Sequence, residues 1–423
     1  MGRSTDSSGI EVRAITDEER GAWGQALNAG FMRPKGDGEG DFHRERFPEL
    51  GRALGAFDGG RCVGTFRSFA QELTLPGGAV IPTDAITNVT VGPTHRRRGL
   101  LSRMMRQDLD AAVARGDAAA TLIAAEYRIY GRFGFGPATA QRGKLIDKAR
   151  AGGIDVPAEA LEGSIELLTL DEYAKVGPEL HERFRRTQPG AVSRTDFSHR
   201  MRTGQVANSP WPYKEPLVAL YRDAAGTPAG LLAYRVTEEE WRNWLPRETT
   251  LKVEDYYAVS AAAYAALWKF ALEVDWIVRV SIKDLRLDDP LQLMLRDGRA
   301  MTDNGDSCDD FLWVRVLDVP KCFGARTYDV PGRFVFEVED RMGYTAGRYA
   351  VEAAADGSAV CTRTADPAEF ACDVSVLGAL LLDHLPLRRL AAAGRVVELV
   401  PGALRNAERV LRADQHPWCP DVF

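Results

Sequence analysis

The spacing of apolar residues changes from strand-like to helix-like within the first 150 residues. Apolar runs at 53–57 and 62–66 flank Asp58-Gly59-Gly60, a pattern typical of a β-hairpin. From Gly99 to Ala114 apolar residues recur every three or four positions, which predicts an amphipathic helix. The small apolar residues of 119–125 predict a buried strand. A strand, a loop, a helix and a second strand in this order predict parallel neighbours joined by a crossover.

The same order of elements returns in the middle of the chain. Residues 219–235 predict another hairpin, with a Gly in its returning strand, and residues 251–259 predict the next strand. A helix over 260–274 and a strand over 276–282 complete the repeat. The element order of the first part therefore occurs twice, as in an internal duplication.

Two segments without periodicity mark the predicted domain boundaries. Residues 148–164 mix Ala, Gly and Pro, and residues 303–310 are almost wholly polar. The predicted domains are 1–150, 151–305 and 306–423. The third predicts strands and helical regions over 311–319, 333–338, 347–352, 375–393 and 403–411. Its last seven residues include a Trp, two Pro and a final Phe, which predicts a docked tail rather than a disordered one.

Composition excludes several classes of protein. Hydrophobic residues make up 45% of the 423 residues and charged residues 27%, which is ordinary globular usage. The net charge of −6 disfavours nucleic-acid binding. The chain shows no apolar run of about 18 residues and no signal-like N-terminus, so we expect neither a membrane span nor secretion. Six scattered cysteines without a C-x-x-C pair favour reduced thiols in the cytoplasm and no metal site.

The most informative segment joins the strand that ends at Val91 to the helix that begins near Gly99. The first backbone N–H groups of a helix lack internal partners, and the helix dipole adds positive potential at that point. Such a terminus favours a pyrophosphate. Arg96, Arg97 and Arg98 could add charge-assisted hydrogen bonds, and Gly99 allows close approach of the backbone. The alternative reading is a solvated basic turn.

A second segment, Tyr130-Gly131-Arg132-Phe133-Gly134-Phe135, begins 34 residues after Arg96. Together the two segments resemble the GNAT (N-acetyltransferase) superfamily, whose acetyl-coenzyme A loop has the form Q/R-x-x-G-x-G/A and whose later segment contains Tyr-x-x-x-Gly-Phe. Leu101 replaces the small last residue of the loop motif. The resemblance implies acetyl-coenzyme A as cosubstrate, with the backbone N–H of Val91 polarising the thioester oxygen. The implied binding residues are Val89, Val91, Arg96, Arg97, Arg98, Gly99, Leu100 and Leu101.

The segments 93–101 and 129–137 resemble in particular the enhanced intracellular survival (Eis) family of aminoglycoside acetyltransferases. The resemblance implies an α/β fold with mixed sheets: tandem GNAT-like domains, the second degenerate, followed by a domain like sterol carrier protein. It also implies a homo-hexamer that acetylates a small-molecule amine at one or more positions. The implied catalytic groups are Tyr130 as general acid and the terminal carboxylate of Phe423 as base.

The chemistry of the reaction accounts for two such groups. A primary amine has a pKa of about 10.4 and must lose a proton before it attacks a thioester, while the departing thiolate needs a proton. Tyr127 is the local competitor of Tyr130. Phe423 could instead be a packing residue, and Asp421 could add negative charge near the amine. His95 fits a loop residue beside phosphate better than a base.

Other features leave alternatives open. Residues 256–263, at the equivalent point of the second repeat, contain no Gly or Arg, so we expect one coenzyme A site per chain. The loop 32–41 could feed an acidic pocket suited to polycations. Four aromatic residues could line that pocket or belong to the core, namely Trp23, Phe31, Trp241 and Trp244. The competing functions are a protein-lysine or polyamine acetyltransferase and a non-catalytic lipid-binding protein.

Overall fold

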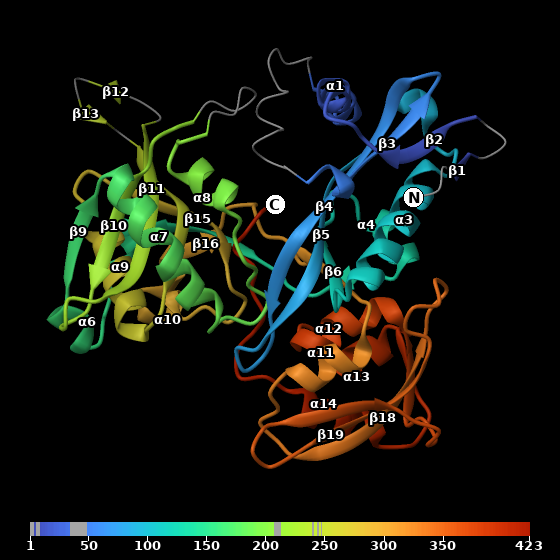
Figure 1. Cartoon of the computed structure of the whole chain (residues 1–423). Coiled ribbons are helices and arrows are strands. Elements are labelled where there is room, and N and C mark those ends of the chain that lie inside the picture. The colour runs from blue at the N-terminus through green and yellow to red at the C-terminus, as the bar shows by residue number, and fades with distance from the viewer. Residues whose placement is uncertain are drawn as a thin grey trace.

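A computed structural model describes residues 4–5, 9–33, 49–206, 213–238, 241–242, 245–246 and 248–423. These residues form three parts, each built on its own β-sheet (Figure 1). The first part lies at the upper right of the view, the second at the left and the third below the first. The end of the chain lies between the first and second parts.

The first sheet has the strand order β1-β2-β3-β4-β5-β6-β17-β7. Its strands are β1 (Ser4–Thr5), β2 (Glu11–Ala14), β3 (Ala53–Asp58), β4 (Arg61–Thr74), β5 (Val80–Val91), β6 (Ala119–Ile123), β17 (Leu312–Val316) and β7 (Gly136–Pro137). The accompanying helices and 3₁₀ turns are α1 (Arg20–Gly30), η1 (Leu50–Arg52), η2 (Pro93–His95), α3 (Leu100–Arg115), α4 (Tyr127–Tyr130) and η3 (Gly131–Phe133).

The predicted hairpin and crossover are confirmed in this sheet. β3 and β4 pair in antiparallel fashion on either side of the turn at Gly59 and Gly60. β5 and β6 are parallel neighbours, and α3 connects them along the chain. The apolar face of α3 is buried through Leu100, Met104 and Leu109, which pack in one cluster with side chains of the sheet. The predicted spacing therefore placed the helix to within a residue or two at each end.

The second sheet has the strand order β16-β8-β15-β14-β11-β10-β9. Its strands are β16 (Met301–Asp303), β8 (Arg142–Asp147), β15 (Arg279–Leu285), β14 (Thr249–Ala258), β11 (Pro228–Glu238), β10 (Leu217–Arg222) and β9 (Ser164–Leu168), and a separate pair is β12 (Trp241–Arg242) with β13 (Leu245–Pro246). The helices and turn are α5 (Lys148–Ala151), α6 (Glu159–Glu162), α7 (Leu170–Arg185), α8 (Asp196–Arg202), α9 (Ala261–Glu273), α10 (Leu291–Met294) and η4 (Gly298–Ala300).

This sheet repeats the plan of the first, as the element order predicted. β10 and β11 form the hairpin, and β14 and β15 are parallel strands joined through α9. The helices α7 and α9 cover opposite faces, because Gly230 lies against Leu267 of α9 while the hydroxyl of Tyr257 donates to Gly177 of α7.

The structure differs from the predicted boundaries at residues 150 and 305 in two strands. β8, expected in the first domain, pairs with β15 and β16 of the second sheet. β17, expected in the third domain, lies between β6 and β7 of the first sheet. The aperiodic segment 148–164 follows β8, and the segment 303–310 precedes β17. Both segments therefore miss the exchange, because strand pairing joins residues far apart in the sequence.

The third sheet has the strand order β20-β19-β18-β21-β22. Its strands are β18 (Gly332–Glu339), β19 (Gly347–Ala353), β20 (Ala359–Arg363), β21 (Phe370–Asp373) and β22 (Val396–Glu398). The helices and turn are α11 (Val319–Ala325), η5 (Val374–Val376), α12 (Leu377–Leu382), α13 (Leu387–Ala392) and α14 (Ala403–Leu411). α12 packs directly on the first sheet, where Gly378 lies against Val314 of β17. The third domain thereby supports the sheet that carries the predicted site.

The tail after α14 is docked, as its composition predicted. Trp418 and Cys419 are buried, and the backbone N–H of Trp418 donates to Pro189 at 2.8 Å. The indole N–H of Trp418 donates to the carbonyl of Asp284 at 2.6 Å, and Gln141 donates to the carbonyl of Cys419 at 2.9 Å. The tail therefore returns from the third domain and is held along the junction of the first two.

Candidate functional site

The site begins where β5 and β6 separate. Their parallel pairing runs from Thr83 with Ala119 to Ile86 with Leu122, although β5 continues to Val91. Against β4, Thr65 pairs with Thr90 and Arg67 with Thr87, so β5 has one extra residue and bulges at Asn88 and Val89. Among the described residues, the β6 side of β5 thus has no strand partner beyond Ile86.

The backbone of Val91 faces this open edge. The next residue, Gly92, donates its N–H to Val63 at 2.8 Å, and successive residues of a strand direct their backbone groups to opposite edges. The carbonyl of Val91 accepts from Nε of Arg96 at 3.3 Å. Its N–H therefore points to the same open side, where a carbonyl oxygen could accept from it.

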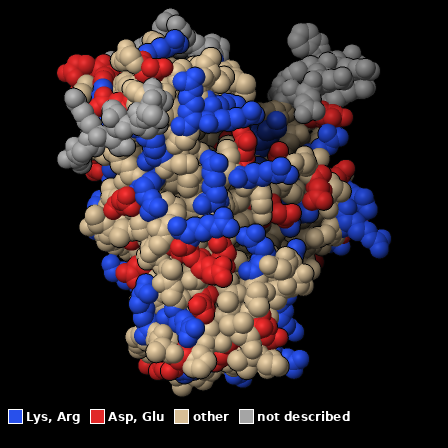
Figure 2. Space-filling model, turned by 90° about the vertical axis from the view of Figure 1, so that its right-hand side faces the viewer, with Lys and Arg blue, Asp and Glu red and all other residues tan. Residues whose placement is uncertain are grey.

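The loop that follows leads into the N-terminus of α3. Gly99 caps the helix in the left-handed conformation with φ 76°, and no side chain caps the first turn. That turn contains no acidic residue, and Arg96, Arg97 and Arg98 are exposed beside it. Lys and Arg side chains also gather over the first domain on the face of the molecule drawn in Figure 2. The open N–H groups and the surrounding cations can hold an anionic group.

Tyr130 ends α4, directly before the 3₁₀ turn η3. Gly134 has φ 84°, and a Cβ there would meet Arg315 and Val374 at 2.7 Å, so this position requires glycine. The tight turn folds Phe135 back so that its ring meets Tyr130 edge-on, with centroids 6.3 Å apart. The Tyr-x-x-x-Gly-Phe spacing thereby fixes the direction of the Tyr130 ring.

The environment of Tyr130 keeps its hydroxyl protonated. The residue is 7% exposed and packs among the side chains that also include Leu100 and Phe135. Burial, with a smaller contribution from the charge of Glu126, raises the pKa of Tyr130 to about 12. Tyr127 differs, because it is 65% exposed and its ring rests edge-on against Trp313 at 5.0 Å. Tyr130 is thus the more enclosed of the two tyrosines.

Phe423 reaches the same sheet from the other end of the chain. The hydroxyl of Thr87 on β5 donates to a backbone oxygen of Phe423 at 3.1 Å. The Phe423 ring meets Phe69 of β4 edge-on, with centroids 5.8 Å apart. The last residue of the sequence therefore lies on the two strands that form the bulge, next to the open edge of β5.

Asp421 is held by cations of the second domain. Its Oδ1 accepts from Nε of Arg194 at 2.6 Å and from Nη2 of Arg202 at 2.9 Å. Its Oδ2 lies 3.2 Å from Nε2 of His181. Burial alone would raise the pKa of Asp421, but the two arginines and the histidine hold it far below its usual value. Its charge is balanced inside the protein, which disagrees with the expectation that it faces the amine.

Several other expected residues have structural positions. Trp23 is fully buried, and its indole N–H donates to Leu54 at 2.8 Å, so it belongs to the core. Phe31 is 36% exposed at the end of α1, where Gly30 lies directly against Thr90. His95 uses both ring nitrogens, toward Thr94 of the same loop at 2.8 Å and Asp58 at the end of β3 at 3.1 Å. Trp244, the side chain of Trp241 and most of the loop 32–41 lie outside the described residues.

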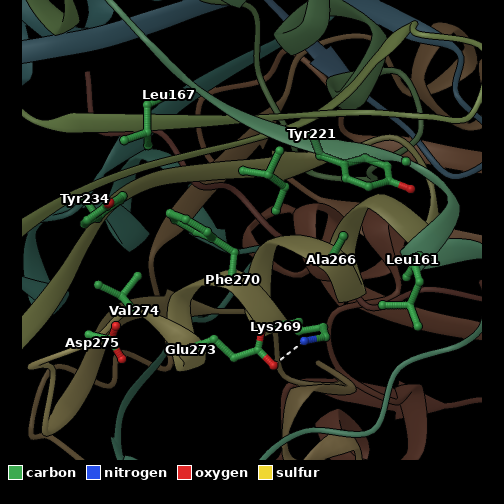
Figure 3. A pocket seen from close by; sticks show the side chains of 13 residues that line it. Leu161, Leu167, Tyr221, Tyr234, Ala266, Lys269, Phe270, Glu273, Val274 and Asp275 are labelled. Carbon is green, nitrogen blue, oxygen red and sulfur yellow. Dashed lines mark hydrogen bonds and ion pairs between the residues drawn. The ribbon is translucent and has the colours of Figure 1, made fainter.

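A separate hollow of about 540 Å³ lies on the second domain (Figure 3). Tyr234, Phe270 and Leu167 line it from β11, α9 and β9. Its Lys269 and Glu273 pair with each other, so these charges are engaged locally. None of the residues that line it belongs to the open edge of β5 or to the Tyr130 segment. This hollow is therefore distinct from the predicted site.

Two further features concern metals and membranes. Within the described parts of the chain, no three His, Cys, Asp or Glu side chains gather in a way that could hold a metal ion. None of the described helices is both long and apolar enough to span a bilayer.

Comparison with known families agrees with this architecture. Residues 11–138 and residues 190–316 each match a model of the acetyltransferase (GNAT) domain. Residues 319–420 match the sterol carrier protein domain. The predicted tandem plan, with mixed α/β sheets and a third domain of the sterol-carrier type, is confirmed.

Full-length relatives decide the family. An uncharacterized N-acetyltransferase of Streptomyces avermitilis is 47% identical over 98% of this chain and 99% of its own length. N-acetyltransferase Eis of Mycobacterium tuberculosis is 34% identical over 85% of each chain. The chain belongs to the Eis family of GNAT acetyltransferases. The crystal structure of Eis1 from Mycobacterium abscessus, 30% identical, covers 99% of this Eis-family chain and all of its own, with a TM-score of 0.85.

Proposed function

We propose that this Eis-family acetyltransferase moves an acetyl group from acetyl-coenzyme A to a primary amine of an aminoglycoside, at one or more positions. The observation that carries the proposal is the convergence on β5 of three groups. These are the outward N–H of Val91, the buried Tyr130, which belongs to the apolar cluster against which Val89 and Val91 pack, and the end of the chain, which Thr87 holds at 3.1 Å.

The donor would lie along the open edge of β5, between Val89 and the first turn of α3. Its pyrophosphate would accept from the free N–H groups of Gly99, Leu100 and Leu101, with Arg96, Arg97 and Arg98 nearby. The N–H of Val91 would donate to the thioester oxygen, where negative charge develops during attack. This edge is the part of β5 that β6 leaves open after Ile86.

The terminal carboxylate of Phe423 would accept a proton from the substrate ammonium, directly or through water. The amine nitrogen then bonds to the thioester carbon, the carbon–sulfur bond breaks, and the nitrogen loses its second proton as the amide forms; that proton restores Tyr130 after the tyrosine has protonated the thiolate. Tyr130 would donate its proton to the departing thiolate, and a pKa of about 12 keeps that proton in place at neutral pH. The proposal takes Phe423 as the end of the chain, which the intact mass of the protein checks.

The proposal extends to the assembly and setting of the enzyme. By family resemblance it would work as a homo-hexamer. All six cysteines are free thiols, and five of them are buried, which suits a reducing cytoplasm. A carboxylate at the site and a net charge of −6 suit a polycationic amine better than an anionic substrate. A protein lysine or a polyamine would satisfy the same chemistry.

A mass measurement tests the substrate class. The protein is incubated with acetyl-coenzyme A and, in parallel, with aminoglycosides, polyamines and Lys-containing peptides, and the added acetyl groups are counted. We expect the mass of the aminoglycosides to increase by one or more acetyl groups. Acetylation confined to peptides or polyamines would move the substrate to that class, and no acetylation of any amine would contradict the proposal.

A further inference from the structure

Two sets of contacts hold the tail after α14, one at residues 416–419 and one at Asp421. The first set holds residues 416–419 through backbone contacts and the buried indole of Trp418. Beyond Cys419, the side chain of Asp421 is the next anchor in the sequence, and Val422 after it is 67% exposed. Only Val422 separates Asp421 from Phe423.

The partner of Asp421 is itself immobilised. The guanidinium of Arg194, whose side chain is 1% exposed, binds Asp255 of β14 through both terminal nitrogens at 2.8 Å. Its remaining Nε donates to Asp421 at 2.6 Å. With Arg202, the cluster contains two cations and two anions, so its charges balance without any group from the substrate. A bidentate contact of this kind fixes orientation as well as distance.

The segment that carries Arg194 is tied to β4. Val192 forms a bridge with Leu73, and the backbone N–H of Ser193 donates to Glu72 at 3.0 Å. The hydroxyl of Ser193 in turn accepts from the N–H of Glu72 at 2.9 Å. β4 is also the strand whose Phe69 contacts Phe423. A continuous series of contacts therefore runs from β4 through Arg194 and Asp421 to Phe423, which returns to β4.

We propose that the Arg194–Asp421 pair is a latch that positions the terminal carboxylate of Phe423 against β5. Arg194 and Asp421 are positioning residues, because they act through Phe423. The inference rests on the proposed function for its effect on turnover, but the latch itself can be measured independently.

The latch sets how far the chain end can move. An extended chain spans at most about 3.6 Å per residue, so Phe423 lies within about 7 Å of a fixed Asp421. Without that contact the next anchor is Cys419, and the reach doubles to about 14 Å. Misplacement by about 1 Å can already lower a rate about 100-fold. Loss of the latch should therefore lower kcat and leave donor binding intact.

Asp421→Asn keeps the size of the side chain and removes its charge. We measure kcat, KM for acetyl-coenzyme A and the rate at which a carboxypeptidase specific for aromatic ends releases Phe423. We expect the release of Phe423 to accelerate about 10- to 100-fold, because the charge-assisted hydrogen bonds of Asp421 are lost. We expect kcat to fall by about the same factor, with KM for acetyl-coenzyme A unchanged. The matched control is Asp414→Asn, which removes an exposed charge from the same tail and should change none of these.

Two further variants keep the outcomes separate. Arg202→Gln removes the 2.9 Å contact with Asp421 together with the 3.3 Å ion pair with Asp255, while Arg194 keeps its bonds to both carboxylates. It should shift release in the same direction by less, which serves if Asp421→Asn does not fold. A chain lacking Phe423 tests the proposed base alone, since full turnover without Phe423 contradicts the proposed function whatever the latch does. Release of Phe423 from a folded Asp421→Asn protein at the wild-type rate overturns the latch.

Discussion

The hydroxyl of Thr87 donates a 3.1 Å hydrogen bond to a backbone oxygen of Phe423, 336 residues later in the chain. Thr87 lies one residue before the bulge of β5, and Val91 lies four residues beyond it on the same strand. The contact therefore brings the last residue of the sequence to the strand whose outward Val91 N–H we propose as the donor to the thioester oxygen. The proposed role of the terminal carboxylate can therefore be tested by moving it.

Adding one Gly after Phe423 should abolish most turnover. The extension moves the terminal charge by up to about 3.6 Å and leaves a neutral amide at Phe423. Thermal unfolding and acetyl-coenzyme A affinity should stay normal, because the added residue lies beyond Phe423 and removes none of the contacts that hold Trp418 and Cys419. A Gly added at the N-terminus is the control. Wild-type kcat in the C-terminally extended protein would leave Phe423 as a packing residue.

Tyr130→Phe should lower kcat by about 10²–10⁴, the usual size of general acid catalysis. The substitution keeps the ring contact with Phe135 and removes only the proton donor. Because burial raises the pKa of Tyr130 to about 12, we expect no loss of activity from its ionisation below about pH 10. Tyr127→Phe is the matched control on the exposed side of the same turn. The assignment is wrong if Tyr127→Phe, and not Tyr130→Phe, is the inactive variant.

Replacing both Arg96 and Arg97 by Ala should weaken acetyl-coenzyme A binding, by about 1.5–3 kcal/mol for each charge-assisted hydrogen bond that is lost. Calorimetry should also show one site per chain, since α9 begins after Ser260 without a glycine or arginine loop. Lys175→Ala, an exposed cation of the second domain, should change nothing. Two sites per wild-type chain, or an unchanged affinity in the double variant, would contradict this interpretation.

Asp108→Asn should stabilise the protein at neutral and alkaline pH. Asp84 of β5 and Asp108 of α3 are both buried, with Ser68 donating to Asp108 at 2.7 Å and Arg115 to Asp84 at 2.7 Å. Burial and the charge of Asp84 raise the pKa of Asp108 well above its usual value, so its folded carboxyl retains a proton that the unfolded chain has lost. The wild type should therefore lose stability as pH rises above about 4 toward that raised pKa.

An amide at position 108 has no such proton to lose. The difference in Tm between Asp108→Asn and wild type should widen from pH 4.5 to pH 8. A Tm difference for Asp108→Asn that stays constant with pH would mean that Asp108 does not retain a proton in the folded protein.

The sequence predicted those parts of the fold that depend on neighbouring residues. The helix from Gly99 and the parallel strands around it follow from local apolar spacing, and the docked tail follows from the composition of its last seven residues. The exchange of β8 and β17 between sheets could not be predicted, because Leu312 pairs with Ile123 and Ile146 with Met301 across more than 150 residues. No local pattern encodes such a pairing.

The candidate site likewise contains residues that the sequence could predict and residues that it could not. Tyr130 and the Arg96–Gly99 loop could be chosen from their spacing, whereas the contacts of Asp421 with Arg194 and Arg202 join residues more than 200 positions apart. The buried pair of carboxyls did leave a signal. Asp108 stands on the apolar face of α3, four residues after Met104 and one before Leu109, where a charged residue has no ordinary reason to be.

The position of β17 between β6 and β7 also constrains the order of events during protein synthesis. Residues up to Pro137 supply the rest of the first sheet, yet its seventh strand in spatial order ends at Val316. At about 5–20 residues per second, a ribosome needs roughly 10–35 s to translate from one to the other. During that interval the nascent first domain exposes an unpaired edge at β6, next to the turn that carries Tyr130.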